Sequence, residues 1–241
     1  MVDKRAERGV PSLVWRAGQE RRLAMLNAAA PLEGRRVLVD GCGIGLYVRA
    51  IRRFTPHVFG IDIEPTYLVQ GRCAGVTELV QAACEQLPFP EATFDVVLSN
   101  EVLEHVHDDR AAAREIARVL RPGGRAVIFA PNRWYPFETH GVYWRGRYYF
   151  GNKPLVNWLP SVMRNRLAPH VRAYTAAQLL QLFADTPLQL VSLQGVYPAL
   201  DNVIARRRVL GQSLRALFDA LERSPLHRFG ISHLLVLEKV T

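Results

Sequence analysis

The ten residues Leu38–Tyr47, which read LVDGCGIGLY, indicate the fold more clearly than any other stretch of this sequence. An apolar run ends at Asp40, and glycines follow at positions 41, 43 and 45. Glycine lets a backbone turn sharply and approach a ligand closely, because no Cβ stands in the way. A strand that leads directly into such a turn is typical of a nucleotide-type site. We therefore expect a nucleotide-like ligand at this turn.

The spacing of the glycines narrows the class of ligand. The pattern is GxGxG, whereas the dinucleotide fingerprint GxGxxG would need its third glycine at position 46, which is Leu46. No lysine followed by serine or threonine stands after the turn, so the phosphate-binding loop of ATP and GTP enzymes is excluded. A nucleotide-like ligand without a phosphate remains.

Strand and helix patterns alternate on both sides of this stretch. Short apolar runs predict strands, and apolar residues at helical spacing predict helices. The expected strands are 35–41, 57–63, 77–84, 94–100 and 125–132, and the expected helices are 13–30, 45–54, 65–75 and 111–120, the last capped by Asp108 or Asp109. The RPGG stretch at 121–124 predicts a turn. This alternation predicts an α/β fold with a doubly wound, mostly parallel sheet and helices on both faces.

The second half of the chain has a different texture. Residues 133–173 are rich in Trp, Tyr, Arg and Pro and show no clean period, so we expect an insertion after the fifth strand. The pattern then predicts a helix over 174–187 with Thr175 as its cap, a strand over 188–198, one basic amphipathic helix over 201–223 and a last strand over 232–240.

Bulk properties limit the class of protein. The chain has 241 residues, which suits a single domain, and it contains no apolar run of 18 residues. The N-terminal MVDKRAERGV does not resemble a signal peptide, and Cys42, Cys73 and Cys84 have no metal or disulfide spacing, so we expect a cytoplasmic protein. The net charge of +9 favours anionic partners or reflects a merely solvated basic surface.

Several segments resemble one known family in order along the chain. DGCGIG (40–45) resembles the first motif of the class I S-adenosylmethionine-dependent methyltransferases, of the small-molecule type (methyltransferase domain 11-like), and GIDIEP (60–65) resembles their second motif. Residues 84–106 resemble the third and fourth motifs, and 120–132 the fifth strand with its preceding turn. The resemblance implies a Rossmann-like sheet of seven strands whose last strand is antiparallel, and S-adenosylmethionine as the cofactor.

The resemblance also implies a set of cofactor-binding residues. Its glycine turn, with Asp40, would hold the amino acid part of the cofactor, and Asp62 would accept the ribose hydroxyls unless it merely caps the helix at Pro65. Ile63 and Leu87 would cover the adenine. The family often has an aspartate where this chain has Ala83, so Cys84 or Glu85 would take over that contact. Asn100 and Glu101 would form the floor near the methionine part. The expected cofactor-binding residues are Asp40, Gly41, Cys42, Gly43, Gly45, Asp62, Ile63, Cys84, Glu85, Leu87, Asn100 and Glu101.

Two histidines are candidate general bases. We expect His105 to lie one helical turn beyond Glu101, and His140 follows the fifth strand. Either could accept the proton of a hydroxyl acceptor, or could be an ordinary loop histidine. The run HVHDD (105–109) could be mistaken for a metal cluster, but His105 and His107 would not share a helical face, so we expect no metal.

The domain organisation that we expect is one methyltransferase domain over 1–241. It comprises an N-terminal helical cap (1–33), a cofactor-binding core (34–132), a substrate lid (133–173) and the C-terminal strands and helices (174–241). The lid combines nine aromatic residues with arginines such as Arg145 and Arg147, which suits an apolar and anionic acceptor. A self-packed cap or a dimer contact would suit the same composition.

We therefore expect methyl transfer to a small molecule, at a hydroxyl of an apolar, lipid-linked or glycosylated metabolite. An RNA or protein substrate ranks second, and a cofactor-binding subunit without activity ranks third. The basic amphipathic pattern of residues 205–223 would also allow contact with an anionic membrane surface. The acceptor atom and the oligomeric state stay open.

Overall fold

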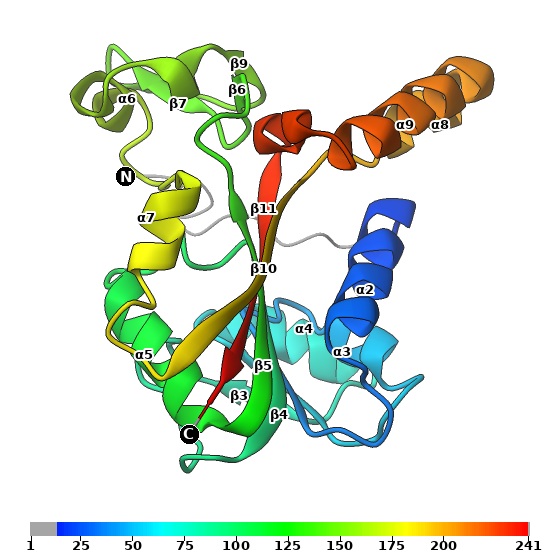
Figure 1. Ribbon diagram of the computed structural model, residues 1–241, viewed down its shortest axis with the longest axis vertical. Coiled ribbons are helices and arrows are strands. Elements are labelled where there is room, and N and C mark those ends of the chain that lie inside the picture. Colours follow the sequence, from blue (N-terminus) through cyan, green and yellow to red (C-terminus); the bar gives the residue numbers. More distant parts are fainter. Residues whose placement is uncertain (1–13, 241) are drawn as a thin grey trace.

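A seven-stranded sheet runs through the centre of the molecule in the computed structural model, which describes residues 14–240 (Figure 1). The strand order is β10-β11-β5-β4-β1-β2-β3. The strands are β1 (Val37–Asp40), β2 (Val58–Asp62), β3 (Leu79–Gln81), β4 (Phe94–Asn100), β5 (Leu120–Pro131), β10 (Leu188–Val196) and β11 (Ser232–Lys239). Strands β1 to β5 pair in parallel, and β11 is antiparallel to both of its neighbours, β5 and β10. The expected doubly wound sheet with an antiparallel last strand is confirmed.

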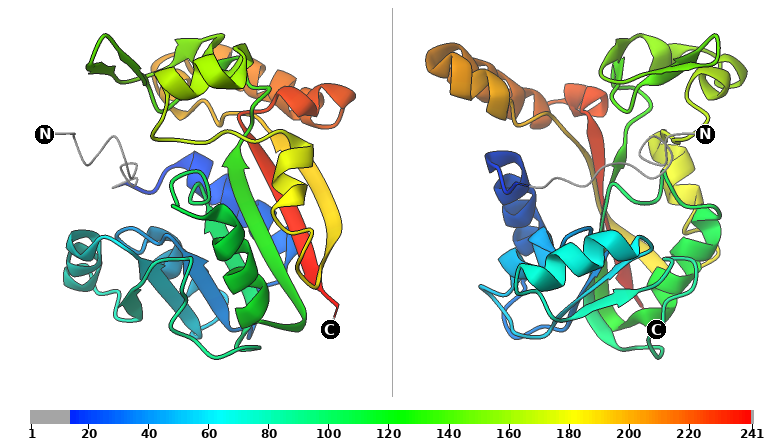
Figure 2. Two further views of the ribbon diagram at one scale, coloured as in Figure 1. Left: turned by 90° about the vertical axis from the view of Figure 1, so that its left-hand side faces the viewer. Right: turned by 180° about the vertical axis from the view of Figure 1, so that it is seen from behind.

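Helices cover both faces of this sheet (Figures 1 and 2). One face carries α2 (Ala17–Ala29), α3 (Leu46–Ile51) and α4 (Pro65–Cys73), and the other carries α5 (Asp109–Val119) and α7 (Ala176–Gln181). Alternate strand residues point to opposite faces. In β1, Val37 and Val39 join the core on the α2 side, whereas Leu38 joins the core on the α5 side. Each central strand is therefore buried on both faces, which explains its continuous apolar sequence.

Two of the expected elements are wrong in detail. The RPGG stretch at 121–124 lies inside β5, where the pairing with β4 shifts register between Phe94 and Val96. The expected single helix over 201–223 is two helices, α8 (Asp201–Arg206) and α9 (Arg208–Glu222), because Arg207 has the non-helical angles φ −143° and ψ 77°. Gly211 lies directly against Ile204, so the two helices fold back on each other. The expected caps Asp108 and Thr175 are confirmed.

The segment after β5 forms small elements of its own. It contains two two-stranded sheets that are separate from the central sheet. These elements are β6 (Phe137–Glu138), β7 (Val142–Trp144), β8 (Arg147–Tyr149), β9 (Lys153–Pro154), the 3-10 helix η1 (Val156–Trp158) and α6 (Ser161–Leu167). A further 3-10 helix, η2 (Pro225–Phe229), precedes β11. The insertion and the α8–α9 hairpin both lie beyond the end of the sheet at which β5 finishes (Figure 1).

Within residues 14–240, none of the helices has both the length and the apolar character that crossing a bilayer requires.

Candidate functional site

A cavity of about 600 Å³ lies where β1, β2 and β4 end. Because parallel strands all point the same way, their carboxyl ends meet at one edge of the sheet, and ligands of open α/β sheets bind there. Its lining includes Asp40, Gly41, Cys42, Gly43, Asp62, Ile63, Cys84, Glu85, Asn100, Glu101, His105 and His140. The structure therefore brings twelve of the fourteen residues expected from the sequence to one cavity.

The remaining two residues serve the fold instead. Leu87 is buried in the core on the α5 side, and its backbone N–H donates to Glu115 Oε2 at 2.7 Å. Gly45 has φ +82° and precedes the first residue of α3, with Val76 packed against it. Neither lines the cavity, so their expected contacts with a cofactor stay without support here.

The glycine turn is built for close approach of backbone to side chain. Gly41 has φ +65° and Gly43 has φ +54°, a region that residues with a Cβ rarely adopt. A Cβ on Gly41 would lie 2.3 Å from Val102 Cγ2. Only glycine therefore fits at position 41, because any other residue would strain the backbone and its Cβ would collide with Val102 in the segment after β4.

Asp62 holds the glycine turn in place from the next strand. Its Oδ2 accepts the backbone N–H of Gly43 at 2.8 Å, and its Oδ1 accepts that of Glu64 at 2.9 Å. The cap residue of α4 is Glu64, so the alternative in which Asp62 caps this helix does not hold. Partial burial raises the pKa of Asp62.

Asp40 presents an unsatisfied oxygen at the same place. The residue is 1% exposed, and its Oδ2 accepts the Ser99 hydroxyl at 3.0 Å. Its Oδ1 has no hydrogen-bond partner among the described residues. Burial, together with the charges of Asp62 and Glu85, raises the pKa of Asp40 to about 7. A buried acceptor without a donor is costly, so this atom invites a donor from a ligand. We call the part of the cavity formed by Asp40, Gly41, Gly43 and Asp62 the glycine end.

The charge of the lining matches the expected cofactor. Acidic side chains recur around the cavity, and no lysine or arginine is among its lining residues; the acidic ones are Asp40, Asp62, Glu64, Glu85 and Glu101. S-adenosylmethionine carries an ammonium and a sulfonium, both cationic, whereas a dinucleotide carries anionic phosphates. The unpaired Asp40 oxygen and this acidic lining would attract the cationic groups of S-adenosylmethionine, and they would repel the phosphates of a dinucleotide.

The floor of the cavity depends on an arginine that the sequence reasoning missed. Arg22 of α2 donates to Asn100 Oδ1 at 2.7 Å and to Glu101 Oε1 at 2.8 Å. The Ser232 hydroxyl, from β11, also donates to Glu101 Oε1, at 2.6 Å. Glu101 has φ +57°, which is rare for a residue with a side chain. Burial acts to raise the pKa of Glu101, but Arg22 and Ser232 outweigh it and the pKa is lowered. The only signal in the sequence was that the leading helix carries arginines between its apolar residues.

The side chains of His105 and His140 meet at the other end of the cavity. Their ring centroids are 5.3 Å apart. The expected helical turn from Glu101 to His105 is wrong, because residues 101–108 form irregular turns and α5 begins at Asp109. Burial, and then the neighbouring His140, lowers the pKa of His105 to about 4. His140 Nδ1 lies 3.1 Å from Glu138 Oε1.

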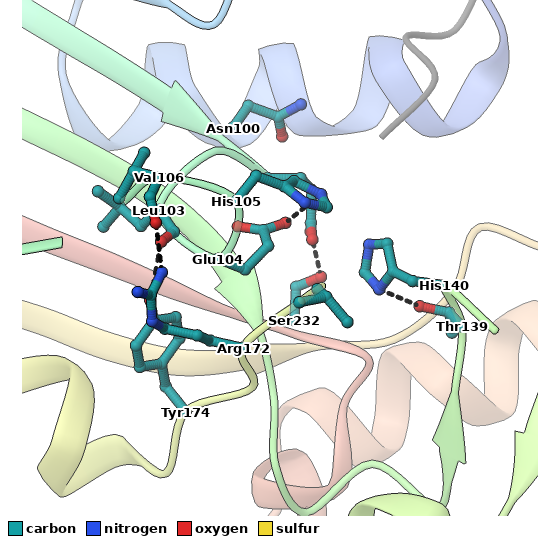
Figure 3. A network of polar contacts seen from close by, with 12 residues as sticks. Asn100, Leu103, Glu104, His105, Val106, Thr139, His140, Arg172, Tyr174 and Ser232 are labelled. Carbon is teal, nitrogen blue, oxygen red and sulfur yellow. Dashed lines mark hydrogen bonds and ion pairs between the residues drawn. The ribbon is translucent and has the colours of Figure 1, made fainter. Parts of the chain in front are cut away.

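Glu104 lies beside these histidines, and its side chain is fully buried (Figure 3). One atom each of Glu104, His105 and His140 lies within 4.8 Å of the other two. A second cavity, of about 660 Å³, is lined by Glu104 and shares His105 with the first. We call His105 and His140, which line the first cavity, together with the adjoining Glu104 of the second cavity, the histidine end. In the suspected HVHDD run, by contrast, His107 is exposed and Asp108 caps α5.

Two cysteines and two tyrosines also line the cavity. Cys42 and Cys84 are buried, and burial raises the pKa of both thiols, so neither is a reactive thiolate. Tyr47 and Tyr67 also line the cavity. Tyr47 belongs to the quoted stretch LVDGCGIGLY, but nothing in its spacing showed that it would turn back toward the site.

The sequence matches a known domain family over the segment that forms this site. Residues 38–128 match the model of the family described as methyltransferase domain. The ubiquinone biosynthesis O-methyltransferase of Xylella fastidiosa (strain 9a5c) is 37% identical over 118 residues, which are 46% of this chain and 48% of that protein. The protein of the same name from Paracidovorax citrulli is 36% identical over 122 residues, 46% of this chain and 50% of that protein. The chain thus spans about half the length of the curated relatives it matches.

Solved structures share the fold over almost the whole chain. An S-adenosylmethionine-dependent methyltransferase from Mesorhizobium loti has a TM-score of 0.60 at 21% identity, covering 89% of this chain and 96% of that one. A putative methyltransferase from Bacillus halodurans gives 0.62 at 21% identity, with 92% and 100% coverage. The [4+2]-cyclase SpnF gives 0.60 at 19% identity, with 97% and 85% coverage. The fold alone therefore does not determine the reaction.

Proposed function

We propose that the chain is a class I S-adenosylmethionine-dependent methyltransferase and that it methylates a hydroxyl oxygen of an apolar small molecule. The observation that carries this proposal is the division of one cavity into two chemically different ends. The glycine end has the unsatisfied acceptor and tight backbone that suit the cofactor. The histidine end has the imidazoles that suit an acceptor group which must lose a proton.

At the glycine end, three features would hold the cofactor. Asp40 Oδ1 would accept the ammonium, the turn at Gly41–Gly43 would allow close backbone approach, and Asp62 would accept the ribose hydroxyls. Bound there, S-adenosylmethionine supplies a methyl group on an electrophilic sulfonium. The protein then has to orient an acceptor in line with that methyl and exclude water, which together can contribute on the order of 7–11 kcal/mol.

At the histidine end, His105 and His140 are both candidates for receiving the acceptor's proton. A general base must be unprotonated before it acts. The lowered pKa of His105 keeps its imidazole neutral at physiological pH. His140 shares the cavity wall, and its Nδ1 is engaged by Glu138. We propose that the two rings flank the acceptor hydroxyl.

The apolar character of the acceptor is inferred from the insertion after β5. Large aromatic side chains there are at least half exposed, among them Trp134, Trp144, Phe150 and Trp158. Exposed aromatic clusters usually mark a surface that binds something. We propose that residues 133–173 cover the acceptor as a lid. The relatives named ubiquinone biosynthesis O-methyltransferases match 46% of this chain, so they support oxygen as the methylated atom without identifying the acceptor.

The test first measures cofactor binding and then measures methyl transfer to an acceptor. Calorimetric titration with S-adenosylhomocysteine should give micromolar binding, and NAD should give none. The protein should then transfer a labelled methyl group from S-adenosylmethionine to hydroxylated apolar aromatics, with the product's methylated atom identified by mass spectrometry. Binding of S-adenosylhomocysteine without transfer to any such acceptor would favour an RNA or protein substrate, or a subunit without activity.

A further inference from the structure

His140 is held by a buried carboxylate two residues before it in the chain. Its backbone N–H donates to Glu138 Oε1 at 2.9 Å, and its ring Nδ1 lies 3.1 Å from the same oxygen. The Thr139 hydroxyl also lies near Nδ1, at 3.4 Å. Figure 3 shows Nδ1 turned toward Thr139 and the opposite edge of the ring turned toward His105.

The charge state of Glu138 fixes the proton of this ring. Burial acts to raise the pKa of Glu138, but the hydrogen bonds from His140 and the charge of Arg164 outweigh it and lower the pKa to about 2. Glu138 is therefore an anion at physiological pH, and a carboxylate anion only accepts hydrogen bonds. The contact thus places the His140 proton on Nδ1 and leaves a lone pair on Nε2.

Arg164 of α6 holds Glu138 from the opposite side. Its guanidinium donates to Glu138 Oε2 at 2.6 Å and to the backbone carbonyl of Val171. Glu138 is 2% exposed and Arg164 is 3% exposed. A buried ion pair keeps its geometry, because loss of either partner would leave the other charge uncompensated. His140 and both residues that orient it belong to the insertion after β5.

His105 has no comparable support. Its Nδ1 is buried and has no hydrogen-bond partner among residues 14–240. Its Nε2 lies 3.9 Å from Glu104 Oε1, which is too long for a hydrogen bond. Burial, and then the neighbouring His140, lowers the pKa of His105 to about 4. An imidazole that resists protonation to this degree is a weak base at physiological pH.

Four other titratable groups lie near the His140 ring: Glu101, Glu104, His105 and His170. The first is already paired with Arg22, at 2.8 Å. The second retains its proton, because burial, and then the charge of Glu101, raises its pKa well above its usual range. Burial lowers the pKa of the other two histidines, so their rings carry no charge at neutral pH. Glu138 is therefore the carboxylate that can stabilise a protonated His140.

We propose that Glu138 and Arg164 are positioning residues, and that through them His140, rather than His105, receives the proton of the acceptor hydroxyl. This inference rests on the proposed function. His140 Nε2 takes the hydroxyl proton as the acceptor oxygen forms its bond to the methyl carbon. The sulfur–carbon bond breaks, and its electron pair stays on sulfur. Glu138 stabilises the resulting imidazolium, which then releases its proton to water.

The first test measures the tautomer of His140 in the full chain and needs no acceptor. Nitrogen-15 NMR of histidine-labelled protein distinguishes a proton on Nδ1 from one on Nε2, and the spectrum of His140→Gln identifies the His140 signals. At mildly alkaline pH the parent should carry the proton on Nδ1. In Glu138→Gln, the charge of Arg164 should attract the amide oxygen, so the amide N–H groups face His140 Nδ1 and the proton moves to Nε2.

Two further variants serve as controls for this test. Glu115→Gln is the matched control, because Glu115 also pairs with an arginine, Arg118, at 2.7 Å and also accepts a backbone N–H, from Leu87. It should leave the His140 tautomer unchanged. Arg164→Lys keeps the positive charge beside Glu138 and should keep the proton on Nδ1. Unchanged binding of S-adenosylhomocysteine shows that each variant is folded, and the parent's tautomer tests the inference even if Glu138→Gln does not fold.

The second test measures methyl transfer to an acceptor that the parent uses. His140→Gln should lower kcat about 100-fold or more, and Glu138→Gln should lower it at least about 10-fold. His105→Gln should lower it less than His140→Gln does. Glu138→Gln should also move the acidic limb of the kcat profile to lower pH, because the imidazole loses the anion that stabilises its protonated form. A merely structural role of Glu138 would lower kcat without moving this limb.

A parent with the proton on His140 Nε2 would overturn the inference, as would an unchanged tautomer in folded Glu138→Gln. An unmoved acidic limb in Glu138→Gln, or a larger loss of kcat in His105→Gln than in His140→Gln, would also overturn it. Failure of the proposed function gives a different result, which is no binding of S-adenosylhomocysteine or no transfer to any hydroxyl acceptor. The tautomer is measured independently of both.

Discussion

The two ends of the cavity are constructed in different ways. The glycine end comes from one short turn after β1 and the end of β2, and its key features are backbone angles and backbone hydrogen bonds. The histidine end comes from the segment after β4 and from His140, which is 35 residues further along the chain than His105. Its key features are side chains and a buried charge. The first end depends on sterics, whereas the second depends on electrostatic compensation.

This difference suggests a division of labour. A site built from backbone can accept few changes, and it suits a ligand that is the same throughout a family. A site built from side chains on an insertion can change residue by residue, and it suits an acceptor that differs between members. The predictions below test whether the two ends are as independent as their construction indicates.

The largest predicted effect is the loss of S-adenosylhomocysteine affinity when Gly41 is substituted. Gly41→Ala places a Cβ 2.3 Å from Val102 Cγ2 and forces a side chain onto φ +65°. Calorimetry should show at least a 100-fold loss of S-adenosylhomocysteine affinity. The matched control is Gly34→Ala, because Gly34 has φ +66° but open space around it. It should carry the strain of about 1–2 kcal/mol and retain the affinity. Equal affinities of the two variants would show that contact with Val102 is irrelevant.

A second prediction compares one residue from each end. Asp62→Ala should weaken S-adenosylhomocysteine binding by about 1–3 kcal/mol, through loss of the ribose contact and of the bond to Gly43. His140→Ala should leave that binding unchanged, because the residue lies at the histidine end. Calorimetric titration with S-adenosylhomocysteine measures the affinity of both variants. A loss of similar size in both would mean that the ends are coupled.

A third prediction concerns the floor that connects the ends. Arg22→Met removes the partner of Glu101, and both side chains are largely buried, so the free energy of unfolding should fall by about 1–3 kcal/mol. Arg53→Met breaks the pair of Arg53 with Glu20, whose side chains are about half exposed, and should cost about 0–1 kcal/mol. Urea unfolding measures both. A cost for Arg53→Met that matches or exceeds that of Arg22→Met would refute the structural role of the floor.

The smallest effect is expected in the pH dependence of the parent protein's stability, because there the contributions of the two ends oppose each other. The folded pKa of Asp40 is raised to about 7, so its contribution is present below the unfolded pKa of about 3.9 and is lost as the pH rises to about 7. The folded pKa of His105 is lowered to about 4, so its contribution is present above about 6.5 and is lost as the pH falls toward 4.

Between pH 4 and 7 these two slopes offset each other in the parent. Asp40→Asn should therefore make stability rise with pH, and His105→Gln should make it fall with pH, each by at most about 1.4 kcal/mol per pH unit. Unfolding with urea gives the slopes. Slopes of the same sign in both variants would contradict the opposition.

The sequence predicted much of the site because its signals are local. The glycines at 41, 43 and 45 and the aspartates that end β1 and β2 reveal a turn and a strand edge, and the parallel order of the strands then places these ends together. Leu87, which we expected to cover the adenine, does not line the cavity, because an apolar side chain in a loop fits a core as well as an adenine pocket. Arg22 was missed because a single arginine on a basic helix carries no distinguishing spacing.

The histidine end shows most clearly what the sequence could not predict. Reading along the chain, we tested His105 against its neighbours His107 and Asp108, whose spacing argues against a shared ligand set. The structure instead places His105 beside Glu104, and it brings His140, which follows β5 in the sequence, close to both of them. No periodicity within the 101–109 segment could indicate a partner that lies on another segment.

By itself, the sequence determined the alternation of strands and helices, the glycine turn and a nucleotide-like ligand without a phosphate, since each of these follows from hydrophobic period, backbone sterics or local spacing. The resemblance to a known family then implied which cofactor that ligand is. The tertiary structure alone decided that Arg22 and Ser232 hold Glu101, that the helix expected over 201–223 breaks at Arg207, and that Glu104 is buried beside two histidines. These features depend on which distant segments share the same space, and burial there raises the pKa of an ordinary glutamate well above its usual range.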